Sequence, residues 1–223
     1  MKGPLITGAS EHLVEDKPPP PRERTGQHKW LNERARRSLS SMGKADLEMY
    51  LSKLAEEKIR NHALSKGDER LEVMGFLLGN VYRHEGKEYT VVRDVATTNL
   101  EATSVRVKFQ REGFEELFRS LDECGFDYLL VGWYHSHPGH RCFMSETDIE
   151  TQRMMFNQPY HGAIVIDPLN QEIEAFRLQG AMVQDLPFAV YWDEYQNPYF
   201  GESVRRRRVV SNAKQPRTEN EED

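Results

Sequence analysis

Two histidines, a serine and an aspartate stand close together in the middle of the chain, where residues 135–138 read His-Ser-His-Pro and are followed by Ser145 and Asp148. The histidines end an apolar run that predicts a strand, and residues i and i+2 of a strand share one face. Both imidazoles can therefore converge on one ion. Asp148, in the first turn of a predicted helix, adds a carboxylate, and this donor set suits a tetrahedral zinc site with one position open to water. An open position indicates catalysis.

The spacing of these residues is specific. With the composition of this chain, the pattern His-x-His-Pro-x6-Ser-x2-Asp is expected only about 0.00004 times by chance. The histidines outside the pattern are expected to be ordinary surface or core residues. They are His12, His28, His62, His84 and His161. His140 stays open, because it lies within the loop between the predicted ligands.

These residues resemble the JAMM, or MPN-plus, metalloprotease family, whose pattern is an upstream glutamate followed by His-x-His-Pro-x6-Ser-x2-Asp. The resemblance runs over about residues 47–178, and Glu72 fills the upstream position. Within the family the chain looks most like the proteasome-lid type of deubiquitinase and its signalosome isopeptidase relative, because residues 132–139 and Cys142 match their pattern.

The resemblance implies that His135, His137 and Asp148 bind one zinc ion per chain, that Glu72 is the general base and that Ser145 steadies the oxyanion. Zinc lowers the pKa of a bound water to about 7, and a nearby carboxylate that is not a ligand can pass its proton to the leaving amine. A hydroxyl donor at a developing oxyanion typically contributes about 2.7–4 kcal/mol.

Plainer explanations compete for some of these residues. Ser145 can cap the helix that follows it, which is worth about 1 kcal/mol without any catalysis. Glu72 can be a solvent-facing strand residue. Cys142 is not expected to be a nucleophile, because no base is placed for it. The chain also departs from its relatives at residues 140–141 and 143–144, which leaves the substrate open.

Residues 96–108 join two predicted elements through small polar side chains and an alternating Val105/Val107 pair. In related deubiquitinases the matching insertion forms a strand that pairs with the extended C-terminal tail of ubiquitin, so the resemblance implies substrate binding here. Backbone pairing gives affinity, and side-chain pockets would favour a tail that ends in Gly-Gly. The candidate substrate-binding residues are Thr103, Ser104, Val105, Arg106 and Val107.

The elements that must position these groups alternate along the chain. The pattern predicts strands at 47–51, 72–81, 89–95, 128–134, 162–166 and 171–178, and helices at 54–63, 114–124 and from Ser145 to before Pro159. Interleaved strands and helices predict an α/β fold with a mixed sheet flanked by helices. The resemblance implies the MPN (JAMM) fold, a curved sheet in a cytidine-deaminase-like three-layer arrangement.

Composition divides the chain into a catalytic domain, expected over 46–200, and two extensions. Residues 1–45 carry a proline run and few apolar side chains, which predicts a flexible N-terminal extension with a short basic helix at 30–39. Residues 201–223 form a charged tail, in which the run 205–208 is expected to be solvated or to meet an acidic partner. The aromatic stretch after Gly180 is expected to pack in the core, with a partner surface as the alternative.

Charge and hydropathy exclude several classes of protein. The chain has 30 basic and 36 acidic residues and a net charge of −6, which argues against nucleic acid or an anionic membrane as its main partner. No apolar run approaches the roughly 18 residues that a membrane helix needs, and the first residues lack a secretory pattern. Two cysteines, Cys124 and Cys142, are too few for a disulfide scaffold. A cytoplasmic location is expected.

Three functions compete at this point. The first is a zinc isopeptidase that removes ubiquitin or a ubiquitin-like protein from conjugates or trims its precursor, alone or with a proteasome-like or MPN partner subunit. The second is a non-catalytic MPN scaffold, although such relatives have lost metal ligands that this chain retains. The third is a JAMM hydrolase of another substrate. A zinc deaminase is excluded, because its His-x-Glu and Pro-Cys-x-x-Cys signature is absent.

Overall fold

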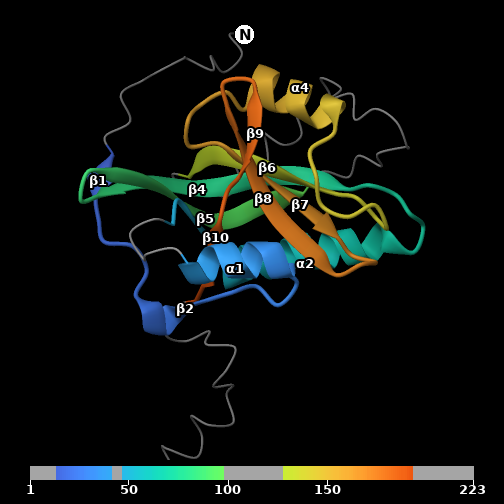
Figure 1. Ribbon diagram of the computed structural model, residues 1–223, viewed down its shortest axis with the longest axis horizontal. Helices are drawn as coiled ribbons and strands as arrows, with labels where there is room; N and C mark the ends of the chain where they lie inside the picture. Colours follow the sequence, from blue (N-terminus) through green and yellow to red (C-terminus); the bar gives the residue numbers. More distant parts are fainter. Residues whose placement is uncertain (1–13, 42–46, 98–127, 193–223) are drawn as a thin grey trace, which may run out of the picture.

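The computed structural model describes residues 14–41, 47–97 and 128–192 (Figure 1). The predicted helix 114–124, the proposed substrate strand 103–107 and the chain from 193 onward lie outside these residues. The division into a domain at 46–200 with two extensions therefore stays a prediction.

Ten strands of the described chain form one sheet. Its central members are β3 (Met49–Ser52), β4 (Met74–His84), β5 (Lys87–Thr97), β6 (Leu129–Ser136), β7 (Gly162–Asp167) and β8 (Glu172–Gln179). The remaining strands are β1 (Glu15–Asp16), β2 (Thr25–Gly26), β9 (Met182–Asp185) and β10 (Phe188–Tyr191). The order is β2-β10-β3-β5-β4-β6-β7-β8-β9, with β1 paired to β4. Parallel pairs such as β6–β7 and antiparallel pairs such as β4–β6 occur together, which confirms a mixed sheet.

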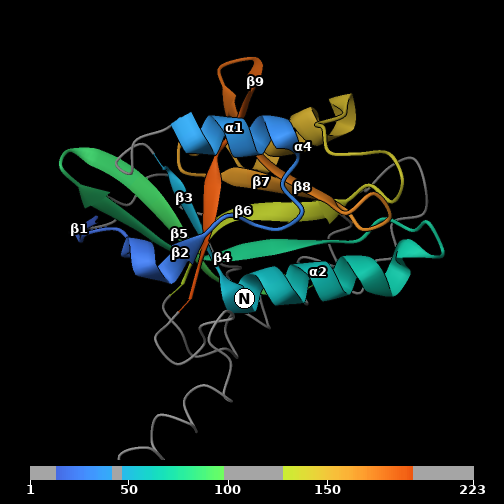
Figure 2. The same ribbon diagram turned by 60° about the horizontal axis from the view of Figure 1, so that its bottom comes forward.

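Helices cover both faces of this sheet. The described helices are η1 (Arg22–Arg24), α1 (Glu33–Ser41), α2 (Lys53–Gly67) and α4 (Glu146–Met155). The start of α2 is set by Ser52, whose side chain accepts a hydrogen bond from Ala55 N at 3.0 Å. Figure 2 shows α2 and α4 on opposite sides of the strands, so the predicted three layers are present. None of these helices is long and apolar enough to cross a membrane.

Alternation along the strands builds three apolar clusters in the described chain, two of which meet at β6. The larger core joins one face of the sheet to α2 and includes Ile59, Leu77, Tyr134 and Ile164. The smaller core lies on the face toward α4 and includes Met74, Phe76, Trp133, Phe156 and Ala163. Strand β6 contributes neighbouring residues to both, and the site described below lies on the α4 side.

Glycines permit two local features of the sheet, a tight hairpin turn and a close approach of two strands. The β4–β5 hairpin turns through Glu85 and Gly86, whose φ values of 49° and 79° are those of a type I′ turn. Gly132 in β6 has φ of 150°, and a Cβ atom there would lie 2.0 Å from the carbonyl oxygen of Gly162. Only glycine lets β6 approach β7 this closely just before the two histidines.

Residues 14–41, part of the extension that composition predicts to be flexible, pack against the rest of the described chain in this structure. Trp30 and Leu31 are buried in the larger core, and Ala35 and Leu39 of α1 pack against it. His28, only 4% exposed, is bonded to Glu56 of α2 at 2.8 Å. Composition missed this because few apolar side chains are needed when the rest of the domain supplies the other half of the core.

The aromatic stretch after Gly180 packs in the core as far as the structure describes it. Phe188, Tyr191 and Trp192 are each at most 6% exposed. This confirms core packing for these three residues, whereas Tyr195, Tyr199 and Phe200 lie outside the described chain.

Candidate metal centre

The two histidines of the motif lie at the end of β6, on the side of the sheet that α4 covers. Trp133 and His135 share this face, and their rings stack with centroids 4.5 Å apart. His137 follows the strand, and its backbone N–H donates to Ile166 O of β7 at 2.9 Å. The side chains of His135 and His137 are only 2% and 6% exposed. The strand period therefore brings both imidazoles to one buried point, as predicted.

Asp148 completes the group from the first turn of α4. Its Oδ2 lies 3.4 Å from His135 Nε2 and 3.5 Å from His137 Nε2. One potential ligand atom from each of the three residues lies within 4.8 Å of the others. Two imidazole nitrogens and one carboxylate oxygen at this separation form a donor set that fits zinc.

Several buried ring nitrogens in this group have no hydrogen-bond partner in the described chain, and a bound metal would supply one. Both ring nitrogens of His135, and Nδ1 of His137, are buried without a hydrogen-bond partner among the described residues. Leaving buried polar groups unpaired costs free energy, so in native proteins such groups are usually satisfied by a bound water or ion. The site therefore fits a bound cation.

The charged groups of this site shift one another's pKa values. Burial would raise the pKa of Asp148, but the neighbouring His135 and His137 and the Ser145 hydroxyl hold it well below its usual value. Burial also disfavours the protonated form of His137, yet Asp148 and then Glu72 raise its pKa overall. The carboxylate is therefore ionised near neutral pH, which is the state that binds a metal.

Ser145 is the N-cap of α4, as its plainer explanation predicted. Its Oγ accepts from Asp148 N at 3.2 Å, and its backbone N–H donates to Asp148 Oδ2 at 2.8 Å, which together form a capping box. Its hydroxyl also donates to the same Oδ2 at 2.6 Å. Ser145 thus holds the predicted ligand in place, and its role at an oxyanion stays a prediction.

Glu72 lies beside the two histidines, just before β4. Met74 pairs with His135 in the antiparallel β4–β6 ladder, and continuing that register by two residues puts Glu72 opposite His137. Ser136 fixes this segment, because its N–H donates to Val73 O and its Oγ accepts from Val73 N, both at 2.9 Å. Glu72 is half-buried, and its charge acts on His137.

Asp167 organises the loop between the predicted ligands, which the sequence did not reveal. Its Oδ1 accepts from Gly139 N at 2.9 Å and its Oδ2 from Arg141 N at 2.7 Å, while Asn170 N donates to Oδ1 at 3.1 Å. Asn170 follows Asp167 by three residues, so only the last of these contacts is local. The first two join positions 26 and more residues apart, so no local pattern could predict them.

The positions where the chain departs from its relatives line the same loop. Phe143 packs on His137 with ring centroids 4.7 Å apart and is 47% exposed, so it presents an aromatic surface beside the site. Arg141 has φ of 65° and its Nη1 bonds Glu172 at 2.9 Å. Cys142 donates to Val165 O at 3.2 Å, and burial raises the pKa of its thiol, which agrees with a packed rather than a nucleophilic cysteine.

Three other histidines serve packing, as expected. His28 bonds Glu56, His62 Nδ1 lies 2.7 Å from the hydroxyl of Tyr134, and His161 Nε2 lies 3.1 Å from Leu130 O. The predicted substrate-binding residues Thr103, Ser104, Val105, Arg106 and Val107 lie outside the described chain, so the structure does not place them.

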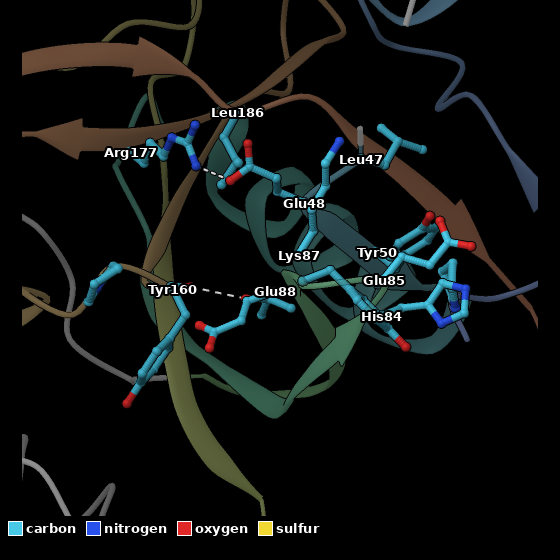
Figure 3. Close-up of a pocket in the computed structure, with 14 residues that line it drawn as sticks. Leu47, Glu48, Tyr50, His84, Glu85, Lys87, Glu88, Tyr160, Arg177 and Leu186 are labelled. Carbon is cyan, nitrogen blue, oxygen red and sulfur yellow. Dashed lines mark hydrogen bonds and ion pairs between the residues drawn. The ribbon is translucent and has the colours of Figure 1, made fainter. Parts of the chain in front are cut away.

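A pocket of about 550 Å³ lies apart from this group (Figure 3). None of its lining residues is a predicted ligand or catalytic residue. Arg177 in its wall pairs with Glu48, and Thr90 Oγ1 donates to Tyr160 O at 3.2 Å. Among the described residues, the group of potential metal donors is His135, His137 and Asp148, and none of these three lines the pocket.

Comparison with known proteins gives one family match and several similar proteins. The family described as JAB1/Mov34/MPN/PAD-1 ubiquitin protease matches residues 45–159, just over half of the chain. COP9 signalosome complex subunit 5 of Debaryomyces hansenii is 36% identical over 171 residues, which is 74% of this chain and 34% of that protein. The 26S proteasome regulatory subunit RPN11 of Eremothecium gossypii is 37% identical over 138 residues, which is 58% of this chain and 42% of that protein.

A solved structure, that of protein DSY2949 from Desulfitobacterium hafniense, aligns with a TM-score of 0.49 at 21% identity, covering 66% of this chain and 97% of that chain. The chain spans about a third of the length of the first curated relatives it matches. The family match extends from before β3 to just before β7 and includes Glu72, both histidines, Ser145 and Asp148. The chain therefore belongs to the JAB1/Mov34/MPN/PAD-1 family.

Proposed function

We propose that this protein is a zinc-dependent isopeptidase that cleaves after the C-terminal Gly-Gly of ubiquitin or a ubiquitin-like modifier. The observation that carries the proposal is the convergence of His135, His137 and Asp148, with buried ring nitrogens that lack partners among the described residues. These three residues would hold one zinc ion per chain. A non-catalytic scaffold does not need such a group, whereas all three donors are present here.

The residues around the ion divide the remaining work. When bound, zinc supplies Lewis-acid chemistry, since it acidifies a water and polarises a carbonyl. Glu72, which is not among the proposed ligands, accepts a proton and delivers it to the leaving amine as general base and then general acid. Its place opposite His137 supports this role. Asp148 and the loop on Asp167 keep the donors in position.

Ser145 is assigned the stabilisation of the oxyanion. Its hydroxyl donates to Asp148 Oδ2 in this structure, so it would have to turn toward the substrate oxygen during the reaction. The cap that its backbone and Oγ make with Asp148 keeps the residue at the site. Ser145 is thus proposed both to cap α4 and to donate its hydroxyl to the oxyanion. Testing the second role needs a substitution that removes the hydroxyl but keeps the helix stable.

The substrate part of the proposal rests on the family and the relatives. The family description names a ubiquitin protease, and the relatives are subunits of a signalosome and of a proteasome. We propose that residues 103–107 pair with the extended tail of the modifier, that the protein acts in the cytoplasm, and that a proteasome-like or MPN subunit is a partner. Exposed Phe143 beside His137 would then contact residues near the scissile bond.

The proposal is tested with ubiquitin, and with ubiquitin-like proteins, fused through their C-terminal Gly-Gly to a reporter. We expect cleavage by the zinc-loaded protein, loss of cleavage after a chelator removes the metal, and recovery when zinc is restored. A protein that binds one zinc per chain but cleaves none of these fusions, alone or with a partner subunit, would argue for a different substrate.

A further inference from the structure

A stack of three rings lies behind the proposed metal ligand His135. The indole of Trp133 lies between the imidazole of His135, with centroids 4.5 Å apart and planes 17° apart, and the ring of Phe156, 5.6 Å away with planes 9° apart. Trp133 and Phe156 are at most 2% exposed. The imidazole therefore rests on a flat, buried support that is itself backed by a second ring.

This ring stack helps to orient the imidazole, a task that a hydrogen bond usually performs at a metal-ligating histidine. A metal-ligating histidine normally donates its second ring N–H to a carboxylate, carbonyl or water, and that bond sets the orientation of the ring. Neither ring nitrogen of His135 has a hydrogen-bond partner among the described residues. Among the described residues, the imidazole is held by stacking against Trp133, by the edge contact with the ring of His137 and by the 3.4 Å approach of its Nε2 to Asp148 Oδ2. Of these three contacts, only the stack on Trp133 comes from a residue that is not itself a proposed ligand.

Gln152 fixes the indole that provides the stacking. Its Oε1 accepts from Trp133 Nε1 at 2.6 Å, and its Nε2 donates to Phe156 O at 2.9 Å and to His161 O at 3.4 Å. The side chain therefore uses its acceptor once and both of its donor hydrogens. Gln152 is 1% exposed, so each of these bonds is made away from water.

The same residue also ties the third proposed ligand to the strand. Gln152 follows Asp148 by four residues in α4, so the two side chains lie on the same face of the helix. Its bond to Trp133 holds that face of α4 against β6, which carries His135. The distance of 3.4 Å between Asp148 Oδ2 and His135 Nε2 spans these two elements, which the Gln152–Trp133 bond joins in addition to the apolar packing around Trp133.

We infer that Gln152 is a positioning residue for the metal centre, acting through Trp133 on His135 and through α4 on Asp148. This inference deepens the proposed function and rests on it. It concerns how tightly the site holds a metal, and it holds whichever modifier is cleaved. Neither residue of the Gln152–Trp133 pair would contact the ion.

The test measures zinc affinity by competition with a chromophoric chelator, using zinc ion alone as the probe. Gln152→Leu fills a similar volume but removes the acceptor, and we expect zinc to bind about 10- to 100-fold more weakly. Tyr134→Phe is the matched control, because Tyr134 is the next residue of β6 and the substitution removes a partly buried hydrogen bond to His62 on the other face of the sheet. We expect its zinc affinity to equal that of the wild type.

A second variant approaches the same bond from the other side, and covers the case in which Gln152→Leu fails to fold. Trp133→Phe keeps a ring to stack on His135 but removes the indole N–H, and we expect weaker zinc binding here too. In the double variant the two losses should not add, because both remove one contact. Circular dichroism confirms that each variant is folded.

The outcomes separate the two proposals. If the wild type binds no zinc, the proposed function fails, and this inference falls with it. If the wild type binds one zinc and folded Gln152→Leu binds it equally tightly, only the positioning role is overturned. If the losses of zinc affinity in the two single variants add in the double variant, Gln152 does not act on His135 through Trp133.

Discussion

The oxygen of Asp148 that faces the two histidines is also the oxygen that accepts the hydroxyl of Ser145, at 2.6 Å. The same oxygen accepts the backbone N–H of Ser145 at 2.8 Å. Helix capping and ligand placement are therefore one arrangement, in which the start of α4 and the orientation of the carboxylate depend on each other. Ser145 is consequently a structural residue whether or not it also acts in catalysis.

Ser145→Gly separates the capping role of Ser145 from its proposed catalytic role at the oxyanion. Glycine at an N-cap costs only a few tenths of a kcal/mol, whereas alanine costs about 1 kcal/mol. If the hydroxyl stabilises the oxyanion, kcat of Ser145→Gly should fall about 10²- to 10³-fold while its melting temperature stays near that of the wild type. Activity is measured on the Gly-Gly fusion at saturating zinc. Near wild-type turnover would leave Ser145 with the capping role alone.

The proposed substrate strand is tested by hydrogen exchange across residues 96–108, with and without a ubiquitin-like partner. Backbone pairing protects amide protons, so we expect slower exchange at residues 103–107 when the modifier is bound. Glu72→Gln protein is used because we expect it to be inactive, so that the complex persists during labelling. The same exchange rates with and without the modifier would remove these residues from the substrate site.

Local patterns predicted most elements correctly, because the apolar residues that define them lie within one strand or helix. Strands β3 to β8 and helices α2 and α4 begin and end within a few residues of the predicted positions. The motif also brought together His135, His137 and Asp148, since the strand period and the first turn of a helix determine where they point. The family match confirms the predicted fold class.

Contacts between distant residues were not predictable in this way. Asp167 bonds the loop at 139–141, and Gln152 bonds Trp133, across separations that no local period encodes. The packing of residues 14–41 was missed for the same reason, since His28 finds Glu56 on a helix 28 residues away. Sequence patterns identify which side chains can do chemistry, whereas the residues that hold them are found only in the folded chain.

The N-terminal segment is expected to depend on Glu56. This carboxylate is 1% exposed and pairs with His28, Lys53 and Arg60. Glu56→Gln removes the charge, and we expect unfolding free energy to fall by about 2–3 kcal/mol and trypsin to cut within residues 14–41 faster. Glu57→Gln, whose carboxylate is 49% exposed, is the matched control and should change stability by less than about 0.5 kcal/mol.

The stabilisation that ionised Glu56 provides depends on pH in a defined direction. Burial disfavours the ionised form, but bonds from His28, Lys53 and Arg60 lower the pKa of Glu56 to about 2. The stabilisation is therefore present above about pH 4.5 and is lost as pH falls toward 2. Equal cutting of Glu56→Gln and wild type at pH 7 would show that the segment is held by its apolar contacts alone.

Glu174 has the opposite effect on stability. Burial first, and then the charge of Asp185, raises its pKa to about 7. The folded chain thus holds this proton more tightly than the unfolded chain, so stability falls as pH rises from about 4.5 to about 7. Glu174→Gln should raise unfolding free energy at pH 8 on the order of 1 kcal/mol, and change it little at pH 4. Denaturant titrations at both pH values measure this, and a gain at pH 4 equal to that at pH 8 would contradict it.

The most direct test of the account compares Glu72→Gln and His137→Ala with the wild type in cleavage of a ubiquitin-like protein fused through Gly-Gly to a reporter, with bound zinc measured in the same samples. We expect the wild type to bind one zinc and cleave. Glu72→Gln should keep zinc and lose at least about 100-fold in rate, because proton transfer is removed but the donors remain. His137→Ala should lose both. Equal rates for Glu72→Gln and wild type would contradict the central claim.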